Sequence, residues 1–194
     1  MKLAKDLRRV MIFGPSGSGK TTFANDLGKI LGSKVIHLDD IFWGPNWKIP
    51  DTDVFRNEVL SQMPSEKWVI DGNYSKIRPD ILPKATFAIF LNLPKPLIYW
   101  RIFARTAARN SRFKFHNPTP LPLKVLNSGS KEFILDSTWD LISFSRRYYK
   151  NKLPGMIEEI KASLGEGNYI ILSRPRDVKY LLIKIKKIKS QEKT

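Results

Sequence analysis

Residues 14–22 read G-P-S-G-S-G-K-T-T and match the phosphate-binding loop pattern G-x-x-x-x-G-K-[ST]. Glycines let the chain curl so that successive backbone N–H groups point toward a phosphate, and a following helix presents its positive end to the same anion. In such a loop Lys20 reaches the β- and γ-phosphates, and the Thr21 hydroxyl binds Mg²⁺. The residues that we expect to bind a nucleotide are Gly14, Pro15, Ser16, Gly17, Ser18, Gly19, Lys20, Thr21 and Thr22.

The loop lies between a strand pattern and a helix pattern. Residues 10–13 form a short apolar run, and Phe23, Leu27, Ile30 and Leu31 recur at helical spacing after the loop. A glycine-rich turn without a ligand is the alternative. The strand–loop–helix order is the context that the motif requires, and it favours a phosphate site.

Two aspartates stand at the end of the second apolar run, residues 35–38. At this strand end, beside a γ-phosphate, a carboxylate can orient an acceptor hydroxyl, take its proton or hold Mg²⁺ through water. We assign this catalytic and acceptor-binding part to Asp39, with Asp40 in reserve. The alternative is that both are loop or helix-cap aspartates. We expect His37 to be a packed strand residue.

The third apolar run, residues 68–70, is followed by Asp71-Gly72-Asn73-Tyr74. Asp71 fits the second acidic site of a phosphate-loop protein, which binds Mg²⁺ through water. Gly72 would let the backbone approach a ligand closely, and Asn73 and Tyr74 would then touch the acceptor. A simple Asp-Gly turn is the alternative.

Four arginines form a candidate phosphate clamp. Arg101, Arg105, Arg109 and Arg112 fall on one face of a helix expected from residue 96 to about 110, and residues 81–131 contain no acid. Guanidinium groups suit bidentate binding of phosphates. In phosphoryl transfer an arginine aimed at the developing charge stabilises that charge. A basic surface helix is the alternative.

Two further residues are assigned to flat ligands. Trp43, in an aromatic stretch, offers a face on which a planar substrate could stack. Arg174 follows the apolar run 169–172, where an adenine could rest.

Five apolar runs alternate with helical patterns along most of the chain: residues 10–13, 35–38, 68–70, 87–91 and 169–172. Continuous runs are typical of strands covered on both faces. The pattern predicts an α/β P-loop NTPase fold in three layers, with a five-stranded, mainly parallel sheet flanked by helices. Residues 111–130 are rich in proline, and we expect a lid there. A break at 153–155 precedes a helix at 156–164, and 175–194 form a basic helix and tail.

Composition predicts one domain over residues 1–194. The chain is 42% hydrophobic and has no cysteine, which excludes a disulfide framework and a thiolate metal site. No apolar run has membrane-spanning length and no signal peptide is evident, so we expect a cytoplasmic protein. The net charge of +16 is concentrated in residues 81–131 and 174–194. Such a field attracts phosphates, nucleotides, nucleic acids or anionic lipids without choosing among them.

Together these residues resemble the adenylate-kinase-like P-loop kinases, and most closely a bacterial group often labelled DNA topology modulation proteins. The resemblance rests on the phosphate loop, on His37-Leu38-Asp39 followed by Trp43, and on W-V-I-D-G-N-Y at residues 68–74. It implies a five-stranded parallel sheet, ATP with Mg²⁺ and a closing lid.

The resemblance also carries residue assignments and one departure. Arg101 and Arg105 match arginines that open the lid and touch ATP in adenylate kinases. Those enzymes continue the third strand as D-G-F-P-R, with the arginine on the acceptor phosphate. This chain has D-G-N-Y instead, and Arg78 comes later. We place Arg78 beside Asp39 and Asp71 in the acceptor pocket.

The expected function is transfer of the γ-phosphoryl group of ATP to a small-molecule or nucleotide acceptor. The alternative is a nucleic-acid-associated ATPase or regulator, which the net charge and the lysines of residues 184–193 suggest. No zinc-finger or aromatic RNA-binding motif supports the reading of specific bases.

Overall fold

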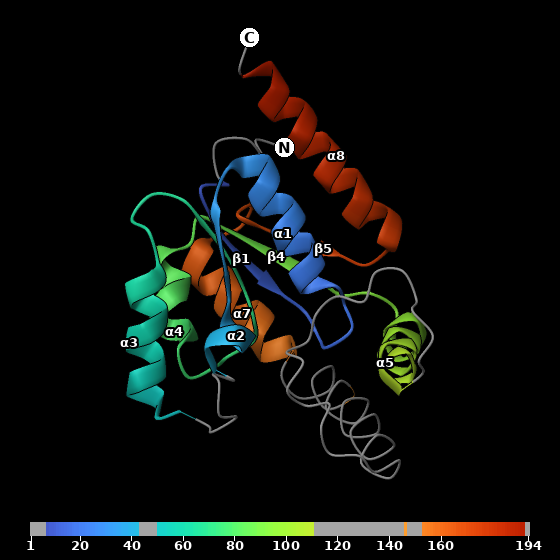
Figure 1. Ribbon diagram of the computed structural model, residues 1–194. Helices are drawn as coiled ribbons and strands as arrows, with labels where there is room; N and C mark the ends of the chain where they lie inside the picture. The colour runs from blue at the N-terminus through green and yellow to red at the C-terminus, as the bar shows by residue number, and fades with distance from the viewer. Residues whose placement is uncertain (1–6, 43–49, 111–145, 147–152, 193–194) are drawn as a thin grey trace.

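A five-stranded parallel sheet forms the centre of the protein (Figure 1). The computed structural model describes residues 7–42, 50–110, 146 and 153–192, with 106–110 described by their backbone alone. The strand order is β2-β3-β1-β4-β5, and all four neighbouring pairs run parallel. The strands are β1 (Arg9–Phe13), β2 (Lys34–His37), β3 (Trp68–Asp71), β4 (Phe87–Leu91) and β5 (Tyr169–Leu172). The predicted five-stranded, parallel sheet flanked by helices is confirmed.

Helices connect the strands and cover both faces of the sheet (Figure 1). They are α1 (Lys20–Leu31), α2 (Leu38–Phe42), α3 (Thr52–Gln62), α4 (Arg78–Ile81), a 3₁₀ turn (Leu82–Lys84), α5 (Lys95–Asn110), α7 (Leu153–Leu164) and α8 (Pro175–Gln191). The break expected at 153–155 is wrong. These residues form the first turn of α7, where Pro154 is tolerated because first-turn N–H groups lack helical partners.

Strand β1 shows why the apolar runs are continuous. Successive side chains of a strand point to opposite faces. Val10 and Ile12 enter the core formed with α1 and α8, whereas Met11 and Phe13 enter the core formed with α3, α4 and α7. Both faces are therefore dry, and every β1 position from residue 10 to 13 must be apolar.

The carboxyl ends of the strands lie at one edge of the sheet, because all strands are parallel. Strand β3 pairs with β1 on one side and with β2 on the other. In these pairs the last residue of β2, His37, is the partner of Asp71 in β3. The loop after β1 therefore lies next to the end of β3, which in turn neighbours the end of β2.

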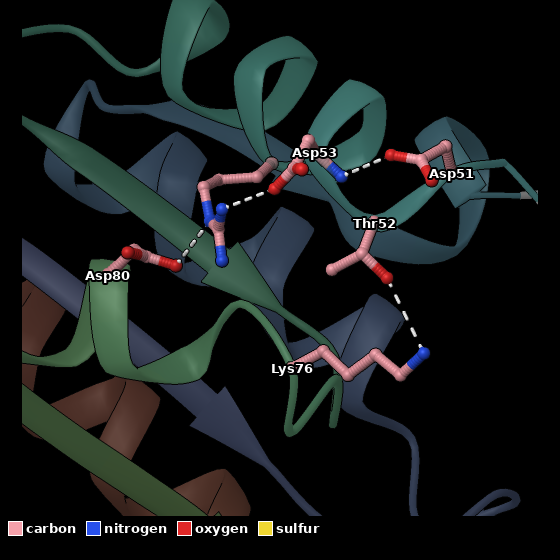
Figure 2. A network of polar contacts seen from close by, with 6 residues as sticks. Asp51, Thr52, Asp53, Lys76 and Asp80 are labelled. Carbon is pink, nitrogen blue, oxygen red and sulfur yellow. Dashed lines mark hydrogen bonds and ion pairs between the residues drawn. The ribbon is translucent and has the colours of Figure 1, made fainter.

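Polar contacts tie α3 to the segment that follows β3 (Figure 2). Arg56 of α3 donates from Nη1 to Asp53 at 2.5 Å and from Nε to Asp80 of α4 at 2.8 Å. Lys76 donates to the Thr52 hydroxyl at 3.4 Å. Two of these contacts, Arg56 with Asp80 and Lys76 with Thr52, join α3 to the segment that follows β3.

Several expectations fall outside the described residues. They are the lid at 111–130, the basic segment after residue 192 and the aromatic stretch from residue 43. Among the described helices, none is both long and apolar enough to cross a membrane.

Candidate functional site

The loop between β1 and α1 has the backbone of a phosphate cradle. Gly14, Gly17 and Gly19 have φ of 150°, 79° and 89°. Helix α1 begins at Lys20, and among the described residues no side chain caps it and no acid lies in its first turn. The first-turn N–H groups, which lack partners within a helix, and the positive end of the helix dipole therefore face the loop, as an anion site requires.

Helix α5 lies directly against this loop. A Cβ at Gly17 would lie 2.9 Å from Ile102 Cγ1 and 3.0 Å from the Ile98 carbonyl, so no larger residue fits there. Arg101 Nη1 donates to the Ser18 carbonyl at 3.1 Å. The contact with α5 therefore fixes the loop and brings an arginine to it.

Two of the four predicted arginines reach the loop. Besides Arg101, Arg105 donates from Nη2 to the Ser16 hydroxyl at 3.3 Å. Partial burial lowers the pKa of Arg101, but guanidinium groups stay charged in proteins. The side chain of Arg109 and all of Arg112 lie outside the described residues. Two positive charges are thus held beside the loop by contacts within the protein.

Lys20 closes the loop from inside. Its Nζ donates to the Pro15 carbonyl at 3.2 Å. Burial lowers the pKa of Lys20, and the positive charge of Arg105 lowers it further. The nearby carboxylates of Asp39 and Asp71 act in the opposite direction. Lys20 therefore interacts electrostatically with both predicted carboxylates and with one predicted arginine.

The structure brings the two predicted magnesium ligands together. The Thr21 hydroxyl, at the start of α1, donates to Asp71 Oδ2 at 3.0 Å. Asp71 is buried, with 4% of its surface exposed, although strand ends usually carry exposed carboxylates. A buried carboxylate needs partners, and its other oxygen has one on β2.

That partner is His37, whose Nδ1 contacts Asp71 Oδ1. The hydrogen bond to Asp71 raises the pKa of His37 above its usual value, against the opposing effect of burial. The other ring nitrogen, Nε2, lies 3.2 Å from Asn25 Oδ1 of α1. The expectation that His37 is only a packed strand residue is therefore incomplete, because its ring links α1 to the end of β3.

Asp39 lies in the first turn of α2 with an exposed carboxylate. The Tyr74 hydroxyl donates to Asp39 Oδ1 at 2.7 Å. The Tyr74 ring packs against Phe42 and Phe55, with ring centroids 4.7 and 5.0 Å away. Burial raises the pKa of Tyr74, and the nearby Asp39 raises it further, so the phenol remains a donor at physiological pH. Tyr74, predicted to touch an acceptor, also orients the carboxylate predicted to activate it.

The glycine and the asparagine after β3 have structural partners. A Cβ at Gly72, whose φ is 147°, would lie 2.7 Å from Leu38 Cβ, so glycine here makes room for Leu38. The predicted approach of this backbone to a ligand stays a prediction. Asn73 Oδ1 accepts from the Gly14 N–H at 3.3 Å, and its amide nitrogen donates to the Gly14 carbonyl. Asn73 therefore holds the first glycine of the phosphate loop. Its predicted contact with an acceptor stays a prediction.

Arg78 is engaged by a partner from a distant part of the chain. Its Nε and Nη2 both donate to Glu159 Oε2 of α7, at 2.9 and 2.5 Å. The Arg78 side chain is only 13% exposed. The guanidinium that we expected in the acceptor pocket is thus neutralised by α7.

The remaining predicted site residues are exposed or lie outside the described residues. Arg174 is exposed at the start of α8 and pairs with Asp177 at 2.8 Å. Thr22 is exposed on α1. Trp43 lies outside the described residues.

The residues present fit ATP with Mg²⁺. The glycine cradle and Lys20 suit the phosphates, and Thr21 and Asp71 place two oxygen atoms side by side. Mg²⁺ prefers oxygen ligands and is usually held by one or two protein groups together with substrate phosphates. The described residues hold no cluster of three or more His, Cys, Asp or Glu that could bind a metal alone.

Sequence reasoning missed two contacts of this site. Glu159 lies 81 residues from Arg78 in the chain, and no local pattern links them. His37 was visible as a polar residue at the end of an apolar run. Only the register of β2 against β3 identifies its partner.

No protein-family model and no curated protein matches this chain. Some solved structures are similar to this chain at low sequence identity. A shikimate kinase from Acinetobacter baumannii in complex with shikimate is 16% identical, with a TM-score of 0.49 over 96% of this chain and 95% of that chain. A gluconokinase from Sinorhizobium meliloti 1021 is 13% identical, with a TM-score of 0.48 over 96% and 93%. A shikimate kinase from Bacteroides thetaiotaomicron is 13% identical, with a TM-score of 0.45 over 93% and 97%. At these identities and TM-scores the similarity assigns no function to this chain.

Proposed function

We propose that this protein is a phosphotransferase that uses ATP and Mg²⁺ to phosphorylate a hydroxyl group of a small molecule. One observation carries the proposal: the phosphate loop, Lys20, the Thr21–Asp71 pair and two arginines of α5 converge at one edge of the sheet. Such an arrangement offers positioning and charge stabilisation, which are the main contributions of a protein to phosphoryl transfer.

Each group has a part in this scheme. The loop amides, Lys20 and the two arginines, Arg101 and Arg105, hold the phosphates, and the Thr21–Asp71 pair holds the metal. When bound, ATP supplies the γ-phosphoryl group. The acceptor oxygen forms the new P–O bond as the bond to ADP breaks, and Asp39 receives the hydroxyl proton. Tyr74 engages Asp39 Oδ1, so we assign Oδ2 to the acceptor.

The charges on the acceptor side favour a neutral acceptor. Asp39 and Asp40 are both exposed acids at the start of α2. Arg78, the cation that we expected in the acceptor pocket, is paired with Glu159. Like charges across a binding surface are repulsive. We therefore propose a sugar, polyol or nucleoside acceptor in preference to its phosphate ester or to a carboxylate.

The test is a panel of neutral hydroxyl compounds and their phosphate esters with γ-labelled ATP. The expected result is label transfer to a neutral compound, absent from the Lys20→Ala variant. Transfer to none of the compounds, by a protein that binds ATP in calorimetry, would refute the kinase proposal. Transfer to the phosphate ester alone would refute only the neutral acceptor.

A nucleic-acid-associated ATPase is the second candidate, which the exposed face of α8 favours. Arg176, Lys179, Lys186 and Lys187 are exposed along this helix, which extends beyond the sheet in Figure 1. Neutralisation of DNA phosphates gives a salt dependence with a slope of about −0.9 per contact. Fluorescence anisotropy of a labelled duplex at low and high salt tests this candidate. An absence of binding at low salt contradicts it.

A further inference from the structure

Asp71 is the predicted magnesium ligand with two protein partners on its two oxygens. Oδ2 accepts from the Thr21 hydroxyl at 3.0 Å, and Oδ1 contacts His37 Nδ1. An aspartate side chain rotates about two bonds, so a contact to one carboxylate oxygen alone still lets the carboxylate group turn about that contact. Contacts on both sides hold the carboxylate plane in one orientation.

His37 is itself held in place by the fold. The parallel register makes His37 the direct partner of Asp71 across β2 and β3. Its second ring nitrogen lies 3.2 Å from Asn25 Oδ1, one turn after Thr21 on α1. An ionised carboxylate only accepts hydrogen bonds, so Nδ1 is the donor to Asp71. The chain of contacts Asn25–His37–Asp71–Thr21 therefore begins and ends on the same helix.

We propose that His37 is a positioning residue that holds the Asp71 carboxylate against Thr21 and so sets the strength of magnesium-dependent nucleotide binding. This inference rests on the proposed function. His37 does not touch the nucleotide in this scheme, since its two ring nitrogens face Asn25 and Asp71. Partners that orient a metal ligand from behind typically contribute about 10- to 100-fold to metal affinity.

The measured quantity is the ratio between two dissociation constants of the full chain for ATP. One is obtained by calorimetry with EDTA, and the other with excess Mg²⁺. The constant measured without metal reports how strongly the loop and Lys20 bind ATP. The ratio reports the contribution of magnesium binding by Thr21 and Asp71. A structural loss of the loop would change both constants, whereas a loss of carboxylate orientation changes the ratio.

Two variants of His37 distinguish the effect of its hydrogen-bond donor from the effect of its side-chain volume. His37→Leu fills the space but donates nothing, and we expect it to reduce the ratio by about 10-fold. His37→Asn keeps an N–H donor at the δ position, and we expect a ratio within about twofold of the wild type. Lys34→Ala is the matched control, because Lys34 lies on the same strand and donates to the Gln62 carbonyl, away from the site.

The outcomes are distinct. A folded His37→Leu protein with the wild-type ratio overturns the inference. If His37→Leu does not fold, an His37→Asn protein that melts normally but has lost the magnesium effect also overturns it. Absence of any ATP binding by the wild-type chain is different, because it refutes the proposed function itself.

Discussion

The Tyr74 hydroxyl donates a hydrogen bond to Asp39 Oδ1 at 2.7 Å, and so connects the segment after β3 to the first turn of α2. The two residues are 35 positions apart in the chain. The ring of Tyr74 is fixed by Phe42 and Phe55, so the position of the carboxylate depends on an aromatic cluster behind it. In the proposed mechanism, Asp39 would gain from this contact the orientation that it needs to meet an acceptor hydroxyl.

Tyr74→Phe tests this contact. The variant keeps the ring packing and loses only the hydroxyl. We therefore expect the free energy of unfolding to fall by about 1 kcal/mol and the affinity for ATP to stay unchanged. We expect kcat/KM for the acceptor to fall by about 10-fold, because Asp39 is no longer oriented. Tyr180→Phe is the control, since Tyr180 is 66% exposed on α8. Equal kinetics in both variants would show that Tyr74 does not orient Asp39.

Gly17→Ala tests the contact between the loop and α5. The backbone at Gly17 has φ of 79°, and the added Cβ would lie 2.9 Å from Ile102. Gly165→Ala is a matched control, because Gly165 has φ of 76° and nothing within 4 Å of its Cβ position. The left-handed backbone should cost about 1–2 kcal/mol in both. We expect a further loss of stability and weaker ATP binding for Gly17→Ala alone, measured by urea unfolding and calorimetry. Identical losses would mean that α5 adapts to the larger loop.

Glu159→Gln tests the proposed acceptor charge. The substitution removes the negative charge opposite Arg78, so we expect discrimination against a phosphorylated acceptor to fall by about 10-fold. The measurement is the ratio of kcat/KM for the neutral compound to that for its phosphate ester. Glu158→Gln is the control, because Glu158 is its exposed neighbour and pairs with Lys161. An unchanged ratio in Glu159→Gln would show that the charge of Arg78 does not influence which acceptor is used.

The His37–Asp71 contact predicts a pH dependence of stability. The folded-state pKa of His37 is raised above its usual 6.5 by the hydrogen bond to Asp71. A raised pKa contributes stability that is fully present below the unfolded value, about 6.5, and is lost as pH rises through the folded value. We therefore expect the wild type to exceed His37→Asn in unfolding free energy most clearly below pH 6. Urea unfolding between pH 5 and 9 measures this difference, and a difference that grows toward pH 9 would contradict the assignment.

The phosphate loop and the fold class were predictable from the sequence, because both depend on local patterns. The spacing of glycines, Lys20 and Thr21 encodes a loop conformation within nine residues. Continuous apolar runs encode strands that are buried on both faces. Parallel strands then place their carboxyl ends together, which is why Asp39 and Asp71 could be named without coordinates.

The partners of the site residues were decided by the tertiary structure alone. Strand register made His37 the neighbour of Asp71, and the packing of α7 brought Glu159 to Arg78. The position of α5 brought Arg101 to the carbonyl of Ser18. Such contacts join residues far apart in the chain, and each depends on how whole helices and strands pack. Sequence spacing determines which groups are available to do chemistry, but only packing determines which of them meet.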